Sequence, residues 1–341
     1  MRNSRSLFAG LCGALGMLVL ILDSKTAING AAQGIRLCIQ SVIPALFPFF
    51  VLSAMLTGTL TGIKSPILRP LGKLCGIPKG GESILLSGLL GGYPVGAQCI
   101  SQAYTDGKLS QSDARRMLGF CSNAGPSFLF GMSGILFNTK SIPFILWMIH
   151  IISALIVGMI LPKSSSGAVM LSAGKQVRAG QAVQTAVRSI ATVCSWVILF
   201  RMILCFADRW FLWLLPEVIQ ILITGILELT NGYLELAHVQ NEGLRFVLAS
   251  IFLSFGGFCV FLQTASITGQ AGLDLGSYFL GKLLQTAVSA ALSVIVSGLL
   301  FPGFPRLQHP WIVLLTGCVI IVAIITKIKQ NSSSILTSSG V

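Results

Sequence analysis

The sequence predicts an all-α, polytopic integral membrane protein, built from two related halves that contain broken or re-entrant helices. Hydrophobic residues make up 54% of the 341 positions, charged residues make up only 10%, and the mean hydropathy is +0.85. A soluble protein with this composition would have too few charged residues for a surface in contact with water. Several apolar stretches come near the roughly 20 residues that cross a bilayer. Two of these stretches are interrupted at residues 91–98 and 256–263.

The order of apolar, polar and basic stretches divides the chain into six predicted parts. These are an N-terminal transmembrane helix (1–25), a first half (26–161), a cytoplasmic linker (162–186), a second half (187–300), a C-terminal transmembrane helix (301–327) and a disordered tail (328–341). Arg2 and Arg5 precede the first apolar run, as they would in a signal peptide. Because no small-residue cleavage pattern follows that run, we interpret it as an uncleaved helix.

The first half begins with a helix that the sequence places at the membrane interface. Residues 26–42 carry polar side chains on one helical face and apolar side chains on the other, which is typical of an interfacial helix. Pro44 and Pro48 follow. They are expected to kink the entry into an apolar helix over residues 51–63, because proline lacks a backbone donor and clashes with the preceding turn.

Further along, the chain starts a helix at the cytoplasmic interface and then breaks again. Ser110 is expected to cap this helix, with Asp113 in its first turn. A second broken segment follows around residues 122–126, and residues 142–161 are long and apolar enough to cross the membrane. The second half opens with another span over residues 187–207.

Basic residues gather in two segments, residues 64–116 and 163–188. The positive-inside rule predicts that both are cytoplasmic. This bias explains the formal net charge of +13, so the expected partner is the lipid bilayer and no nucleic acid is expected. The nine cysteines are scattered without a CxxC pair and the three histidines lie far apart. Neither a metal site nor a cofactor is therefore expected.

An octet of helix-breaking residues interrupts an apolar stretch of the first half. It reads Gly-Gly-Tyr-Pro-Val-Gly-Ala-Gln over residues 91–98, and residues 256–263 repeat its two glycines, an aromatic residue and its glutamine. Backbone groups left unpaired in lipid need protein or water as partners. A broken helix at membrane depth therefore predicts a binding site, and two related breaks predict an internal duplication. The alternative is that glycines permit close helix packing, which is the preferred interpretation for Gly88.

Uncharged polar side chains beside the two octets could bind a polar solute without the cost of burying a charge. The uncharged polar side chains of the second broken segment, around residues 122–126, could bind a solute in the same way. The predicted substrate-binding residues are Gly91, Gly92, Tyr93, Pro94, Gly96, Gln98, Ser122, Asn123, Gly125, Gly256, Gly257 and Gln263.

Charged residues inside predicted spans indicate a site for a coupling ion or proton, because they are costly in lipid. Glu228 is followed by Asn231 in a turn that Gly232 can unwind, so several oxygens can meet there. Arg201 lies well inside a span of the second half. The ion-coupling candidates are therefore Glu228, Asn231 and Arg201. The alternative is that such carboxylates cap helices, as Glu217 could do after a proline.

These motifs resemble the sporulation integral membrane protein YlbJ family, which carries the nucleoside recognition, or Gate, domain. They occur in the family's order, at residues 44–50, 87–98, 122–126, 227–232 and 256–257 with Gln263. The resemblance implies a multi-pass protein of the bacterial inner membrane with two Gate-like halves. It also implies a role, in spore formers, in the formation of the spore cortex and envelope. Nothing in these residues selects a nucleobase.

The sequence favours a secondary transporter or permease for a small polar solute, with the solute and any homo-oligomer left undefined. The alternative is a non-transporting membrane scaffold for sporulation or envelope assembly. Such a scaffold would recruit its partners through the basic loops and would depend on Arg115 and Arg116. No enzyme is expected, because metalloprotease and serine-hydrolase motifs and paired aspartates are absent from the sequence.

Overall fold

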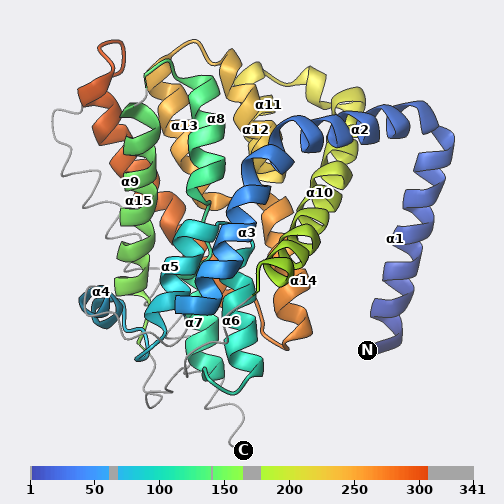
Figure 1. The fold of residues 1–341 in the computed structure, drawn as a ribbon. Coiled ribbons are helices and arrows are strands. Elements are labelled where there is room, and N and C mark those ends of the chain that lie inside the picture. Colours follow the sequence, from blue (N-terminus) through green and yellow to red (C-terminus); the bar gives the residue numbers. More distant parts are fainter. Residues whose placement is uncertain (1, 61–67, 140, 164–177, 306–341) are drawn as a thin grey trace, which may run out of the picture.

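The computed structural model describes residues 2–60, 68–139, 141–163 and 178–305 (Figure 1). All regular elements in these ranges are helices, which confirms the predicted all-α fold. Five helical stretches are long and apolar enough to cross a membrane, namely Ser24–Met55, Ser141–Ile160, Ala179–Trp210, Glu242–Gln270 and Gly276–Leu300. The protein is therefore a multi-pass membrane protein. Most of the predicted linker, the predicted C-terminal helix and the predicted tail lie outside the described residues.

The described residues form fifteen α-helices and three short turns of π- or 3-10 helix. In chain order they are α1 (Arg2–Leu22), α2 (Ser24–Leu37), a π-helical turn (Cys38–Val42), α3 (Ile43–Leu60), α4 (Arg69–Leu74), α5 (Glu82–Gly91), α6 (Val95–Thr105), α7 (Gln111–Cys121), α8 (Pro126–Leu136), α9 (Ser141–Ile160), α10 (Ala179–Trp210), a 3-10 turn (Leu212–Leu214), α11 (Glu217–Leu227), α12 (Leu229–Glu235), a 3-10 turn (Leu236–His238), α13 (Glu242–Phe255), α14 (Gly257–Gln270) and α15 (Gly276–Leu300).

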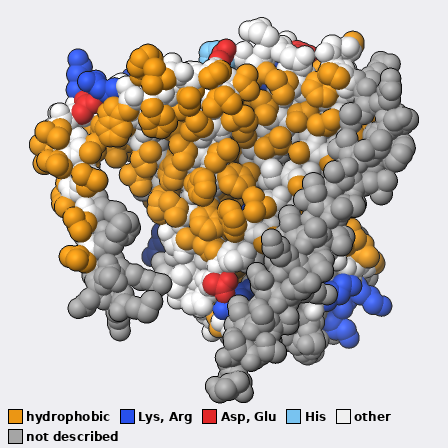
Figure 2. Space-filling view, turned by 180° about the vertical axis from the view of Figure 1, so that it is seen from behind, with side chains coloured by type: hydrophobic (Ala, Val, Ile, Leu, Met, Phe, Trp, Pro, Cys, Tyr) orange, Lys and Arg blue, Asp and Glu red, His pale blue; other side chains and the backbone are white. Residues whose placement is uncertain are grey.

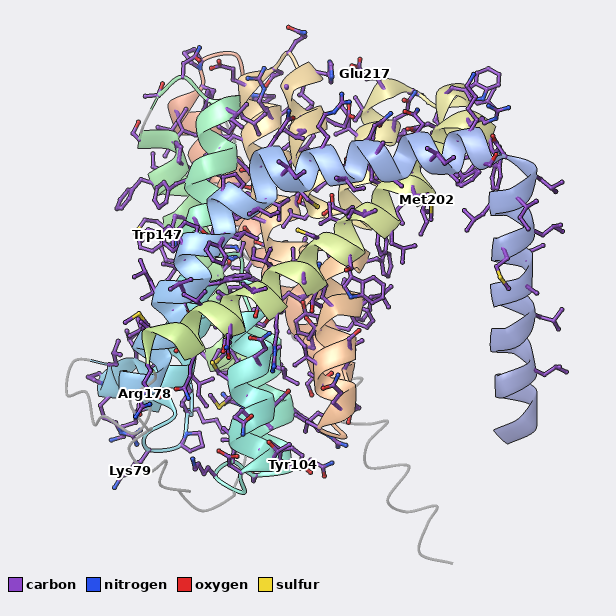
Figure 3. All side chains as sticks on the ribbon, turned by 45° about the vertical axis from the view of Figure 1, so that its right-hand side comes forward. Lys79, Tyr104, Trp147, Arg178, Met202 and Glu217 are labelled. Carbon is purple, nitrogen blue, oxygen red and sulfur yellow. The ribbon has the colours of Figure 1, made fainter. Side chains whose placement is uncertain are left out.

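The N-terminal region forms an arm beside the helical body. α1 stands apart from the other described helices, and α2 runs across one end of the molecule (Figures 1 and 3). α2 packs on α10 at close range, since a Cβ added to Gly30 or Gly34 would lie 2.8 Å from a backbone atom of that helix. The π-helical turn then redirects the chain into α3, just before Pro44. The chain changes direction at this π-helical turn, ahead of both prolines, and Pro48 lies inside α3. The predicted proline kink at the entry to the apolar helix stays a prediction.

Four apolar helical stretches are broken in the body of the protein. The breaks separate α5 from α6, α7 from α8, α11 from α12, and α13 from α14. Both predicted glycine-rich breaks are present. Gly92 has a φ of 78° and Gly256 a φ of 80°, a left-handed conformation that L side chains rarely adopt, so glycine is required where these helices end.

The charged residues indicate how the molecule lies in the membrane. Lys79 and Arg178 lie at one end of the molecule, and Glu217 lies at the other (Figure 3). On the back face, apolar side chains form a broad surface and charged side chains gather towards its edges (Figure 2). This distribution matches a lipid-facing surface, and the positive-inside rule assigns the end with Lys79 and Arg178 to the cytoplasm. We refer to the end with Glu217 as the outer end.

Candidate functional site

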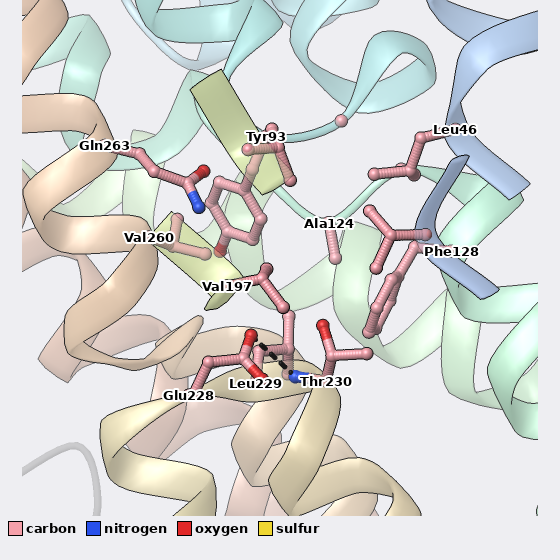
Figure 4. A pocket seen from close by; sticks show the side chains of 14 residues that line it. Leu46, Tyr93, Ala124, Phe128, Val197, Glu228, Leu229, Thr230, Val260 and Gln263 are labelled. Atoms are coloured by element: carbon pink, nitrogen blue, oxygen red, sulfur yellow. Dashed lines mark hydrogen bonds between the residues drawn. The ribbon is translucent and has the colours of Figure 1, made fainter. Parts of the chain in front are cut away.

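Residues from three of the helix breaks, from the π-helical turn and from α3, α8, α10, α12 and α14 line a small cavity inside the body (Figure 4). Its volume is about 40 Å³. The lining comprises Val42, Leu46, Gly92, Tyr93, Ala124, Gly125, Phe128, Val193, Val197, Glu228, Leu229, Thr230, Val260 and Gln263. Most of these side chains are apolar. Tyr93, Glu228, Thr230 and Gln263 are the polar ones, so the cavity offers a few polar groups in an otherwise apolar wall.

The two glycine-rich segments meet at this cavity. The Tyr93 hydroxyl donates a hydrogen bond to the Leu253 carbonyl at 3.5 Å, in the last turn of α13. A Cβ added to Gly256 would lie 3.2 Å from the Tyr93 ring and hydroxyl, so glycine at that position makes room for the tyrosine. Gln263, about two turns further along α14, lines the same cavity. Residues far apart in the sequence therefore build one site.

The first two breaks touch through their backbones. A Cβ added to Gly92 would lie 2.7 Å from the Gly125 nitrogen, and one added to Gly125 would lie 3.0 Å from the Gly92 Cα. Side chains at either position would push the α5–α6 break away from the α7–α8 break. This contact places Tyr93 and Ala124 side by side in the cavity wall (Figure 4).

Glu228 lies at the third break, where it caps α12. Its Oε1 accepts a hydrogen bond from the Thr230 nitrogen at 3.0 Å, and its Oε2 accepts from the Asn231 nitrogen at 2.7 Å and from Asn231 Nδ2 at 2.6 Å. The side chain is 1% exposed and forms no ion pair with a described residue. The Glu228 carboxylate is therefore a helix cap that also lines the cavity, and its role in ion coupling stays a prediction.

A buried polar network lies behind Tyr93, and sequence reasoning missed its central residue, Lys282. The Lys282 ammonium donates to Asn123 Oδ1 at 3.3 Å and to Gln285 Oε1 at 2.7 Å. Gln285 Nε2 also donates to Asn123 Oδ1, at 3.0 Å. Lys282 Nζ lies 5.2 Å from the centre of the Tyr93 ring. A single lysine inside an apolar helix was the signal that could have identified it.

The other predicted site residues lie near the cavity without lining it. Gln98 donates to Ser189 Oγ of α10 at 3.2 Å, and Ser122 is fully buried with no hydrogen-bond partner among the described residues. Gly91, Pro94, Gly96 and Gly257 are packed in the breaks or just beside them. Gln98 and Ser122 therefore belong to the wall around the site rather than to its lining.

Arg201 lies apart from Glu228, in a second cavity of about 200 Å³ at the outer end. Arg201 donates to Gln33 Oε1 from Nε at 3.0 Å and from Nη2 at 2.6 Å. The lining is mostly polar and comprises Arg201, Asp208, Glu217, Gln220, Ile221, Thr224, Glu235 and His238. The Thr224 carbonyl accepts a hydrogen bond from the Glu228 nitrogen at 2.8 Å, so one turn of α11 separates the two cavities.

The fold and this site define an all-α, multi-pass membrane protein whose broken helices enclose a cavity between its spans. Comparison with curated proteins shows similarity to the sporulation integral membrane protein YlbJ of Bacillus subtilis (strain 168). The two are 23% identical over 325 residues, which cover 81% of this chain and 79% of that protein. This similarity confirms the predicted resemblance to a sporulation integral membrane protein of the YlbJ type, and it does not test the predicted Gate domain. No family model matches the chain, and no solved structure matches it.

Proposed function

We propose that this protein is a secondary transporter or permease that moves a small polar solute across the membrane during sporulation. The observation that carries the proposal is the cavity at which three helix breaks meet. Discontinuous helices are expensive in lipid unless they line a site, and secondary transporters place their substrates at such breaks. The similarity to a sporulation integral membrane protein supports the biological setting.

The lining of the cavity supports a polar solute of small size. Tyr93 and Gln263 supply a hydroxyl and a carboxamide, and Glu228 supplies carboxylate oxygens. A cavity of about 40 Å³ has room for about three water molecules, since each needs about 10–15 Å³ of such volume. This volume is too small for a larger solute, so in this proposal the break segments move apart when a solute enters. Glu228 and Asn231 stay the candidates for a coupling ion next to the solute.

The contacts of the basic loops do not favour the scaffold alternative. Arg116 is 5% exposed, and its guanidinium donates to the carbonyls of Cys75, Gly76, Gly158 and Leu161. Arg116 therefore joins segments of this chain, and its donors are not available to a partner protein. Arg115 is more exposed, but it pairs with Asp274 at 2.6 Å.

Flux measurements on two matched glutamine variants test the proposal. The full chain is reconstituted in vesicles, and the uptake of a panel of radiolabelled small polar solutes is measured. Gln263→Leu removes a carboxamide that is 2% exposed and lines the cavity, whereas Gln102→Leu removes an exposed carboxamide that bonds Asp106. Loss of one hydrogen bond to the solute costs about 1 kcal/mol, which slows uptake about fivefold.

The proposal predicts that the wild type and Gln102→Leu take up at least one solute of the panel at similar rates and that Gln263→Leu is slower. Equal uptake by all three proteins would show that the solute does not use this cavity. If the folded wild type moved none of the solutes while restoring sporulation to a strain that lacks its own homologue, the scaffold alternative would be preferred.

A further inference from the structure

Lys282 is a buried amine in the interior of the protein, in the first half of α15. Its side chain is 2% exposed. Its polar contacts are Asn123 Oδ1 and Gln285 Oε1, and its nitrogen lies over the rings of Tyr93 and Tyr278 at 5.2 Å and 5.9 Å from their centres. A lysine at such a position is costly in a membrane protein, and function is the usual reason for its presence.

The surroundings of Lys282 provide no opposite charge. No carboxylate of the described residues forms an ion pair with it. The titratable groups that face it are Tyr93 from the first break, Cys121 from α7, His150 from α9 and Tyr278 from α15 itself. His150 Nε2 accepts a hydrogen bond from the Ala124 nitrogen at 3.1 Å, so that ring nitrogen carries no proton.

The other charged residues beside α15 lie near its two ends, away from Lys282. Glu242 and Arg245 are in the first turn of α13, which packs beside the far end of α15, since a Cβ on Gly243 would meet Ser297 Oγ at 2.6 Å. Asp274 precedes α15, is half-exposed and pairs with Arg115. The amine is therefore surrounded by neutral hydrogen-bonding and aromatic groups.

This environment suits both protonation states of the amine. A neutral amine has two N–H groups, and the oxygens of Asn123 and Gln285 accept both. An ammonium has a third N–H, which the faces of the two tyrosine rings stabilise by cation–π attraction. Gaining or losing a proton therefore breaks no hydrogen bond. A lysine with a purely structural role would instead be expected to have a carboxylate partner.

Tyr93 connects this amine to the solute cavity. One face of its ring lies over Lys282 Nζ, and the same side chain lines the cavity together with Glu228 and Gln263. A solute that displaces Tyr93 removes the aromatic face that stabilises the ammonium. The ammonium then releases its proton to water that enters the opened cavity, and it becomes a neutral amine. Binding of the solute and protonation of Lys282 therefore oppose each other.

We propose that Lys282 is the proton-carrying group of the protein, which makes it a proton-coupled transporter. The proposal rests on the proposed transport function and places the proton behind Tyr93 rather than on Glu228. The amine takes a proton from water when the cavity is closed and returns it to water when the solute enters. No other co-reactant is required.

Side-chain NMR of the full chain in lipid nanodiscs tests the proposal without a solute. Lysines are labelled with 15N at Nζ, and the Lys282 signal is identified by its loss in Lys282→Met. We expect this signal to move between the amine and ammonium positions across the pH range in which the protein stays folded. A Lys282 signal that keeps one protonation state throughout this range would overturn the proposal.

Transport by variants separates this inference from the proposed function. In vesicles with an imposed pH gradient, the wild type and the surface variant Lys108→Met should accumulate a transported solute of the panel. Lys282→Met should lose the accumulation but retain exchange of labelled for unlabelled solute, which also shows that it is folded. Gradient-driven accumulation by Lys282→Met would refute the role of Lys282 and leave the transport function intact. If the wild type moved no solute, the proposed transport function would be refuted. The NMR titration would still decide whether Lys282 exchanges a proton.

Discussion

At the scale of single residues, three glycines allow helices to touch through their backbones. A Cβ added to Gly88 of α5 would lie 1.6 Å from the Cys121 carbonyl oxygen, and one added to Gly96 of α6 would lie 2.2 Å from the same atom. A Cβ added to Gly281 of α15 would lie 2.2 Å from the Gly119 carbonyl oxygen. α7 is therefore packed between neighbours that no larger side chain would permit. The packing role predicted for Gly88 is confirmed, and Gly96 contributes to the same crossing.

Two glycine-to-alanine variants test this packing. Gly88→Ala forces α5 away from the end of α7, and overpacking of this kind costs about 1–3 kcal/mol. Gly134→Ala is the matched control, because Gly134 is also helical and has no atom within 4 Å of an added Cβ. Thermal unfolding in detergent should show a lower Tm for Gly88→Ala and a Tm close to the wild type for Gly134→Ala. Equal Tm values for the two variants would contradict the close crossing.

The sequence predicts residue roles well where a local pattern decides them. Ser110 caps α7 as expected, with its Oγ accepting from the Asp113 nitrogen at 3.1 Å. The sequence did not predict that Lys282 and His150 belong to a buried polar network, because their partners come from helices distant in the chain. Gln98 was expected in the solute site, but it turns towards Ser189, a contact that only the packing of α6 on α10 determines.

At the scale of elements, the broken helices are held in place by side chains that satisfy backbone groups left free. Glu228 caps α12 through two backbone nitrogens. Arg116 of α7 binds carbonyls at the end of α4, in the turn that follows it and near the end of α9, and thereby joins three segments near the cytoplasmic end. A buried carbonyl that loses its donor costs about 1–3 kcal/mol. Glu228 thereby stabilises the α11–α12 break, and Arg116 stabilises the packing of α7 against the segments around α4 and α9.

Adjacent arginines provide a matched test of this anchoring. Arg116→Met retains an unbranched, apolar side chain but removes all donors, so several carbonyls lose their partner. We expect a loss of several kcal/mol in the free energy of unfolding and a poor yield of folded protein. Arg115→Met removes only a partly exposed ion pair, which is worth about 1 kcal/mol or less. For both variants, size-exclusion profiles measure the yield of folded protein and Tm values in detergent measure stability. An Arg116→Met protein as stable as Arg115→Met would refute the anchoring role.

The positions of the breaks could be predicted from the sequence, whereas their arrangement could not. Glycine and proline interrupt helices by local geometry, so residues 91–98 and 122–126 could be identified directly. The predicted interfacial helix and the helix that follows form a single long stretch, Ser24–Met55. A π-helical turn absorbs the change in direction, and such a turn depends on the contact of α2 and α3 with α10 rather than on the local sequence.

At the scale of the whole molecule, segments from both halves of the chain close around one cavity. The first octet contributes Gly92 and Tyr93, the second segment contributes Val260 and Gln263, and Glu228 comes from the break between them. The sequence predicted that two related breaks would form a site, and in the structure they are in contact. Gly256 makes room for Tyr93, because a Cβ added there would lie 3.2 Å from the tyrosine ring. The central claim is that this cavity opens to water and admits the solute.

Thiol labelling of a single cavity residue tests this claim most directly. The nine native cysteines are replaced, and Ala124→Cys or Ala154→Cys is introduced. Both alanines are buried, at 2% and 0% exposure, but only Ala124 lines the cavity. We expect that a membrane-impermeant maleimide labels Ala124→Cys in vesicles, that a transported solute slows this labelling, and that Ala154→Cys stays unlabelled. No labelling of Ala124→Cys, while the exposed control Thr105→Cys reacts fully, would contradict a cavity that opens to water.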